Sequence, residues 1–187
     1  MPLGDAFDRT MEAAREGEHA ALAAIYRDLS PAVLGYLRGQ RAGEPEDLAS
    51  EVFVAVVRGL TAFQGDERSF RSWVFTIAHR RLVDERRRRS RRWEEPVDPG
   101  DFADSLAGSR IGDVEDEALG RLGASWAMKM LGRLTPEQRE VVLLRVLGGL
   151  SVAEVAIVMG KAEGAIKALQ RRALRALARE IERQGVS

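Results

Sequence analysis

Apolar residues recur at helical spacing along most of this chain, and no stretch alternates with the period of two that a strand requires. The first firm pattern begins near Glu18, where apolar side chains return every three or four positions as far as Leu37. Pro31 directly follows Ser30, which suits a kink or a new helix start. The pattern predicts an all-α protein.

A further helix is predicted from Pro45, over the sequence EDLASEVFVAVVRGL. The run VFVAVV alone could be a strand, but Leu48 one turn before Val52 favours about four helical turns. This helix is apolar on more than one side, although a helix in a small lobe needs only one buried face. With Asp47 and Glu51 one turn apart, the surplus indicates either a partner surface or a central core helix whose carboxylates face water. Periodicity alone leaves both open.

Residues 69–92 read SFRSWVFTIAHRRLVDERRRRSRR, which predicts one long helix with Ser69 as its N-cap. Its first half is apolar and aromatic, and its second half is mostly arginine. The polar loop TAFQGDER, residues 61–68, leads into it. Trp73 shares a helical face with Phe70, so we expect it in the core rather than on a stacking surface. Because the arginine run continues a patterned helix, we interpret it as a nucleic-acid surface rather than a solvated tail.

The second half of the chain has a different character. The stretch after residue 93 is rich in Asp, Gly, Ser and Pro and has no sustained period, which predicts a flexible acidic linker. A helix is predicted over 119–134. Two capping boxes follow, at 135–138 and 151–154.

A short helix after the second capping box, a turn with Gly160 and a longer basic helix to Arg183 match the helix-turn-helix layout. Arginine and lysine can hold phosphates or grip guanine, and glutamine can read adenine. The outer face of the last helix presents Lys167, Gln170, Arg171 and Arg175.

Composition narrows the class of protein. The formal net charge of the 187 residues is zero, but the acidic excess gathers in the linker, so the flanking basic segments can still bind a polyanion. The absence of cysteine excludes disulfides and thiolate metal sites. The N-terminus has no signal-peptide pattern, and no apolar run approaches a membrane span, so we expect a cytoplasmic protein without membrane insertion.

Catalysis would need a nucleophile or a carboxylate cluster on rigid elements. Asp47, Glu51 and Asp84 lack supporting polar residues, and His19 and His79 are isolated. We therefore expect no enzyme, no metal and no cofactor. A one-component helix-turn-helix transcription regulator is one non-enzymatic possibility. It would need a ligand or phosphoacceptor domain, for which the first half shows no alternating strand–helix pattern.

The stretch FRSWVFTIAHRRLVDERRRR resembles the "fraWL…IArN…iD..Rr" segment of extracytoplasmic-function (ECF) sigma factors. EPEDLASEVFVAVVRGL resembles their "aeDlvQevFl" helix, and LTPEQREVVLLRVLGGLSVAEVAIVMGKAEGAIKALQRRALRAL resembles their fourth-region domain. The resemblance covers nearly the whole chain in the right order. It implies two small helical domains, region 2 over 1–93 and a region 4 helix-turn-helix over 119–187, joined by a flexible acidic linker over 94–118.

The resemblance implies a promoter-specificity subunit of bacterial RNA polymerase. Its partners would be the polymerase core (the β′ clamp and the β subunit), promoter DNA and a controlling anti-sigma factor. Core polymerase would dock on Asp47, Leu48, Ser50, Glu51, Phe53 and Val57. The minus-ten element would be melted and read by Gln64, Gly65, Asp66, Glu67, Arg68, Arg80, Arg81, Asp84, Arg87 and Arg88. The minus-thirty-five element would be read by Ser151, Glu163, Gly164, Ala165, Lys167, Gln170, Arg171, Arg172 and Arg175.

Three positions depart from the family pattern. Ser50 stands where the family has glutamine in the docking helix, and Arg80 stands where it has asparagine. Ala162 replaces the usual Ser or Thr cap of the recognition helix, which costs about 1 kcal/mol.

Overall fold

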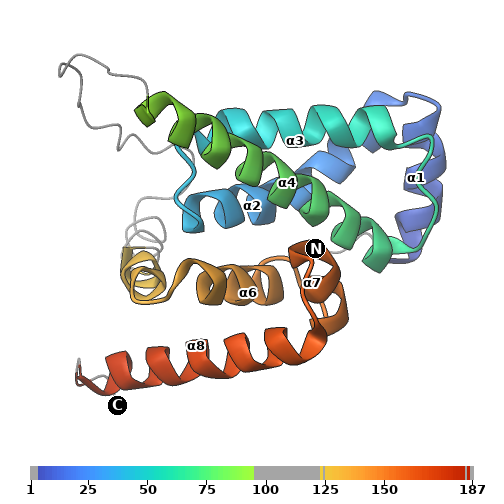
Figure 1. The fold of residues 1–187 in the computed structure, drawn as a ribbon. Coiled ribbons are helices and arrows are strands. Elements are labelled where there is room, and N and C mark those ends of the chain that lie inside the picture. The colour runs from blue at the N-terminus through green and yellow to red at the C-terminus, as the bar shows by residue number, and fades with distance from the viewer. Residues whose placement is uncertain (1–3, 95–122, 124, 184, 186–187) are drawn as a thin grey trace.

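Helices make up the regular structure of the computed structural model, which describes residues 4–94, 123, 125–183 and 185. No strand occurs among these residues, so the predicted all-α class is confirmed. Residues 125–132 form a helical segment that bears no label in Figure 1. A short 3₁₀ helix, η1 (Gly4–Ala6), also has no label. The labelled helices are α1 (Phe7–Arg15), α2 (His19–Gly39), α3 (Pro45–Gly59), α4 (Glu67–Glu94), α6 (Pro136–Val146), α7 (Val152–Met159) and α8 (Glu163–Arg183).

Two lobes lie one above the other in Figure 1. Residues 4–94, with α1 to α4, form the first lobe, and residues 125–183, with α6 to α8, form the second. The predicted linker, 94–118, lies outside the described residues except for its first, and so does the start of the predicted helix 119–134.

A three-helix core holds the first lobe together. In α2, α3 and α4 the buried apolar residues recur every three or four positions, so each helix turns one continuous stripe inward. Helix α3 packs against both α2 and α4, which makes it central to the lobe. The most deeply buried members of the stripes are Leu29, Val33, Leu37, Val52, Val56, Val74, Ala78 and Leu82.

Helix α2 runs without interruption through Pro31, so the predicted possibility of a new helix start there is wrong. Proline removes one backbone donor, which costs a helix interior about 3 kcal/mol. Leu29 and Val33, on either side of the proline, are 1% and 0% exposed. Their burial keeps both halves of the helix against the core and outweighs the lost hydrogen bond.

The start of α4 differs from the prediction. The helix begins at Glu67, and the carboxylate of Asp66 accepts a hydrogen bond from the backbone N–H of Ser69 at 2.8 Å. Asp66 is therefore the cap, and Ser69 lies within the first turn. The backbone N–H of buried Phe70 donates to the Asp66 carbonyl at 2.9 Å, which is the first intrahelical bond that a cap at Asp66 accepts.

An aromatic cluster joins the loop before α4 to its first turns. The ring of Phe63 lies 5.2 Å from the rings of both Phe70 and Trp73, measured between centroids. Trp73 is half-buried and packs against the core, which confirms its predicted core role. A Cβ atom at Gly59 would lie 2.7 Å from the Trp73 ring, so the absence of a side chain there lets the indole lie against the end of α3.

Both predicted capping boxes are present in the second lobe. Thr135 and Gln138 exchange side-chain and backbone hydrogen bonds at the start of α6, and Ser151 and Glu154 do the same at the start of α7. Gly160 ends α7 in the left-handed conformation, with φ of 61°, which glycine adopts without strain. These local signals produce the predicted helix-turn-helix.

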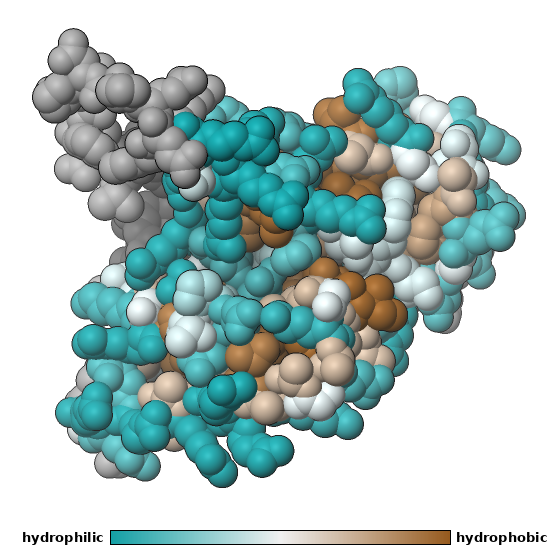
Figure 2. Space-filling model, viewed as in Figure 1, coloured by the Kyte–Doolittle hydropathy of each residue, from teal (hydrophilic) through white to brown (hydrophobic). Residues whose placement is uncertain are grey.

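The two lobes pack directly against each other. Contacts join α2 to α6 and α4 to α7, and one apolar cluster includes residues of both lobes. A Cβ atom at Gly39 would lie 2.8 Å from a Leu143 methyl carbon, so this glycine allows α2 and α6 to approach closely. Apolar residues also gather along this seam in the view of Figure 2.

Trp73→Ala should lower the free energy of unfolding by about 2–3 kcal/mol, because it removes a half-buried ring that bridges α3, α4 and the preceding loop. Urea unfolding followed by circular dichroism measures the loss. Trp126→Ala is the matched control, since Trp126 is 42% exposed and should cost about 1 kcal/mol or less. Equal losses in the two variants would contradict a core role for Trp73.

Candidate nucleic-acid interface

The arginines of α4 fall into two groups, one exposed and one turned inward. Arg80, Arg87 and Arg88 are exposed, whereas Arg86 turns inward and donates to the backbone and side-chain oxygens of Gln40 at 2.8 and 2.9 Å. Arg86 follows Leu82 by four residues and so continues the buried stripe of the helix. Sequence reasoning missed this role, although the spacing carried the signal.

Carboxylates partner the remaining predicted residues of α4 only loosely. Arg81 is half-buried, with its guanidinium 3.7 Å from the carboxylate of Glu51 on α3. Asp84 and Arg87 are exposed and 3.9 Å apart. Surface pairs at such distances contribute little and are screened by salt, so these arginines remain available to another anion.

The loop before α4 mixes exposed and structural residues. Gln64 and Gly65 are exposed, and Gly65 has φ of 146°, a conformation that disfavours a side chain. Asp66 caps the helix, and hydrogen bonds from Ser69 hold its pKa below its ordinary value. Glu67 accepts a hydrogen bond from the backbone N–H of Gly4 at 2.9 Å. Two of the predicted loop residues therefore also hold the loop in shape.

Helix α3 is both a core helix and an incompletely covered surface. Leu48 and Phe53, predicted to contact a partner, are only 4% and 8% exposed, because they belong to the stripe that packs inside the lobe. Asp47, Ser50 and Glu51 are exposed. The predicted surface thus loses two apolar members to the core.

Apolar surface remains on the outside of α3 all the same. Val54 and Val57 are each 49% exposed, and neighbouring Tyr26 is 51% exposed with its ring 4.7 Å from that of Phe53. Asp47 and Glu51 line a cleft of about 430 Å³ between α3 and α4, with Arg88 on its opposite side. Helix α3 is therefore a core helix that also exposes apolar side chains, and its interpretation as a partner surface stays a prediction.

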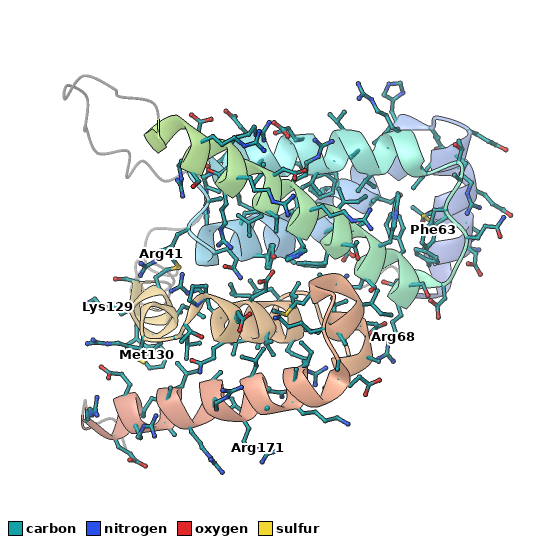
Figure 3. All side chains as sticks on the ribbon, viewed as in Figure 1. Arg41, Phe63, Arg68, Lys129, Met130 and Arg171 are labelled. Atoms are coloured by element: carbon teal, nitrogen blue, oxygen red, sulfur yellow. The ribbon has the colours of Figure 1, made fainter. Side chains whose placement is uncertain are left out.

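The cationic face of α8 points away from the first lobe. Arg171 projects outward in Figure 3, and Lys167, Arg172 and Arg175 are also exposed. Ile166, Leu169 and Ala173 of the same helix are buried against the rest of the second lobe. The apolar stripe thus orients the helix so that its cations face solvent.

Other predicted residues of the second lobe shape this face. Glu163, Gly164 and Ala165 are exposed in the first turn of α8, and Gln170 is half-buried. Ser151 caps α7 through its hydroxyl, which accepts from the backbone N–H of Glu154 at 3.2 Å. Its first role is to begin α7 and so to set the helix-turn-helix geometry.

Two carboxylates of the second lobe contact the first lobe at residues that lie far away in the chain. Glu154 accepts from Arg68 through both oxygens, at 2.9 and 3.2 Å. Glu140 accepts from the Tyr36 hydroxyl at 3.0 Å and lies 2.5 Å from Nδ1 of His79. Sequence reasoning placed Glu154 in a capping box but identified neither carboxylate as a contact between the lobes, because no local pattern marks a partner that lies far away in the chain.

The surroundings of these groups shift their titration. Burial, and then the charge of Glu140, raise the pKa of Tyr36 well above its ordinary value, which keeps its hydroxyl a donor. Burial acts to raise the pKa of Glu154, but hydrogen bonds from Arg68 and Ser151 outweigh it and leave the pKa below its ordinary value.

Comparison with known proteins decides the family. Residues 25–92 match the family model described as Sigma-70 region 2, and residues 125–177 match Sigma-70, region 4. The chain is 33% identical over 188 residues to the ECF RNA polymerase sigma factor ShbA of Streptomyces griseus, covering 95% of this chain and 96% of that protein. This chain belongs to the ECF sigma factor family.

Other comparisons agree with this assignment. The sigma factor is 40% identical over 171 residues to the ECF RNA polymerase sigma factor BldN of Streptomyces coelicolor, covering 90% of this chain but 63% of that relative. Its fold is similar to that of the sigma factor RpoE of Bartonella quintana, determined in complex with the anti-sigma factor NepR. The TM-score is 0.63 at 22% identity, over 88% of this chain and 97% of that one. In the described part of the sigma factor, no helix has the length and apolar character to span a membrane.

In the folded protein, the Glu154 carboxyl should titrate below its ordinary pKa of 4.5. Because folding lowers this pKa, the stability that it contributes is present above about pH 4.5 and is lost as the pH falls through the folded value. Carboxyl-carbon NMR measures the pKa, which Arg68→Ala should move upward. Glu46, whose pKa is lowered by its hydrogen bond from Arg38, is the internal control and should not respond to Arg68→Ala. A Glu154 pKa unmoved by that substitution would contradict the pairing.

Proposed function

We propose that this sigma factor binds core RNA polymerase through the outer face of α3 and reads promoter DNA with two separate cationic helices. The observation that carries the proposal is the arrangement of α4 and α8. Each buries an apolar stripe in its lobe and turns exposed arginines to solvent. Arginine and lysine on such faces hold phosphates, and helix side chains can reach base edges in the major groove.

The domain boundaries proposed from the sequence fit this division of labour. Residues 1–93 form the region 2 domain for core docking and the minus-ten element, and residues 119–187 form the region 4 domain for the minus-thirty-five element. The linker 94–118, fully extended, reaches about 80 Å, so it allows the domains to sit one or two DNA turns apart. Since the lobes pack together in the structure, that spacing requires them to separate.

The minus-ten assignment centres on the loop before α4 and on its outward arginines. Gln64 and Arg68 are exposed beside the aromatic cluster, while Arg80, Arg87 and Arg88 line the exposed side of the helix. Unpaired bases are held by stacking and by polar pockets, and arginines hold the backbone. Asp66 and Glu67 contribute to this site chiefly by shaping the loop.

We also propose that an anti-sigma factor controls the protein. A groove between the start of α3 and the second lobe is lined by Trp126, Met128 and Val146, and Val146 is 73% exposed. Apolar surface of this kind marks a site for a protein partner. A regulator seated there would contact both lobes at once.

Core docking is tested by reversing the exposed charges of α3. Asp47→Arg combined with Glu51→Arg should weaken the affinity for core polymerase at least tenfold, since like charges at an interface oppose association. Fluorescence anisotropy of labelled sigma factor with purified core measures this affinity. Glu12→Arg combined with Glu16→Arg, an exposed pair one turn apart near α1, is the matched control and should bind normally. If the α3 variant binds core with unchanged affinity, the docking assignment is refuted. If the natural sequence does not bind core at all, a transcription regulator that is not a polymerase subunit is favoured instead.

The recognition role of α8 is tested by single alanine substitutions of Lys167, Arg171, Arg172 and Arg175. Each lost phosphate contact should flatten the dependence of log affinity on log salt by about 0.9. A lost base contact should instead cost about 1–3 kcal/mol at one promoter position. Promoter binding by holoenzyme is measured over a salt series, with exposed Arg9→Ala in α1 as control. If every variant binds like the control, α8 is not the recognition helix.

A further inference from the structure

The two lobes contribute different kinds of side chain to the seam between them. The second lobe contributes carboxylates, Glu140 from α6 and Glu154 from α7, and the first lobe contributes the groups that donate to them or face them. The partners are 86 residues apart for Arg68 and Glu154, and 104 apart for Tyr36 and Glu140. These contacts therefore exist only while the lobes are packed together.

The inner contact is enclosed. Tyr36 is 0% exposed and Glu140 is 7% exposed, so the hydrogen bond between them is shielded from water. His79 of α4 lies against the same carboxylate oxygen of Glu140. Hydrogen bonds to a charged acceptor are roughly twice as strong as those to a neutral one, so replacing this carboxylate by an amide should weaken the packed arrangement even though an acceptor oxygen remains.

The outer contact involves a residue of the proposed minus-ten site. Arg68 is the last residue of the sequence TAFQGDER and lies in the first turn of α4, where Figure 3 shows it beside α7. Its guanidinium binds Glu154 in a bidentate geometry, the arrangement by which arginine also binds a phosphate. The same donor groups cannot serve Glu154 and a DNA strand together.

The packed arrangement treats the two DNA surfaces differently. Helix α7 lies against α4, so the second lobe covers one side of the helix that the minus-ten site uses. The cations of α8 face away from the seam and are exposed. The closed molecule thus withholds Arg68 while it leaves the proposed minus-thirty-five helix open.

We propose that Glu140 and Glu154 form an interdomain latch that holds the free sigma factor closed and keeps Arg68 from the promoter strand until the lobes separate on core polymerase. This inference rests on the proposed function of α4 and its loop. The buried hydrogen bond between Tyr36 and Glu140 contributes most of the interaction that keeps the lobes together. The outer pair competes directly with DNA, because the Arg68 side chain is 65% exposed and its interaction with Glu154 is partly screened by water and salt.

The test uses the double variant Glu140→Gln with Glu154→Gln. Glutamine keeps the size and the acceptor oxygen of each side chain, and at position 154 it preserves the capping box with Ser151. Neither residue belongs to the proposed docking or DNA surfaces. Glu137→Gln with Glu182→Gln, two exposed carboxylates of the same lobe, is the matched control; the ion pair that Glu137 forms is with Lys161, within that lobe.

Closure is measured directly in the free, full-length protein. The chain has no cysteine, so Glu12→Cys in α1 and Arg179→Cys in α8 give one spin label on each lobe. Double electron–electron resonance should show one short, narrow distance distribution for the natural sequence and for the control. The latch variant should shift at least half of the population to longer, broader distances. An unshifted distribution overturns the proposal.

The functional arm measures the rate of promoter opening by permanganate reactivity of unpaired thymines. When free sigma factor is added to core and promoter together, the latch variant should open the promoter at least threefold faster than the control. With holoenzyme assembled beforehand, the two should open it at equal rates, because the latch is already released. Acceleration of the same size in both formats would place the effect at the DNA and overturn the latch.

Two further variants separate the latch from the function on which it rests. Glu154→Gln alone disturbs only the outer contact, so this variant should fold normally. When it is added as free sigma factor to core and promoter, it should accelerate promoter opening less than the double variant does. No acceleration would refute the role of the outer contact. Arg68→Ala should slow opening even by assembled holoenzyme. Opening at the normal rate by that variant would refute the minus-ten role of Arg68, whereas the spin-label distances would still report whether the lobes are latched.

Discussion

The burial of one stripe on α4 determines the direction in which each proposed functional group of that helix points. Phe70, Val74, Ala78 and Leu82 lie along the stripe and are at most 1% exposed. A helix held this firmly along one side has a defined rotation about its axis. That rotation directs Arg80 and Arg87 to solvent, turns Arg86 towards Gln40 and places His79 at the seam.

The distribution of charged side chains over the surface, rather than the net charge, determines what this protein can bind. Lys and Arg together number 29 and Asp and Glu together number 29, so the net charge is zero. The outward faces of α4 and α8 are nevertheless rich in arginine, and acidic side chains lie on α3 and at the seam. Association with a polyanion depends on such local fields, because solvent and salt screen the more distant charges. A neutral total therefore does not oppose DNA binding.

Packing of the lobes links the proposed functions to one another. Close approach at Gly39 and the buried contact at Glu140 bring α6 onto α2, and this places α7 against α4. The proposed docking face of α3 and the cationic face of α8 remain outside the contact. Free sigma factor can thus keep its two outer surfaces ready while its inner surface is occupied by its own second lobe.

Local rules in the sequence determined the helices, both capping boxes, the helix-turn-helix and the cationic faces. They could do so because helical period and capping depend on residues within a few positions of one another. Even there, the prediction from local rules was incomplete, because Asp66 rather than Ser69 caps α4, and packing on both sides of Pro31 keeps α2 continuous.

Only the tertiary structure decided which predicted site residues are free to act. It buried Leu48 and Phe53 and engaged Arg68 with Glu154. It also brought Tyr36 and His79 to Glu140. These contacts join residues 61 to 104 positions apart, and each depends on how two separately patterned lobes meet. The spacing of residues along one helix carries no information about that meeting, because it specifies which face is apolar but not which partner will cover it.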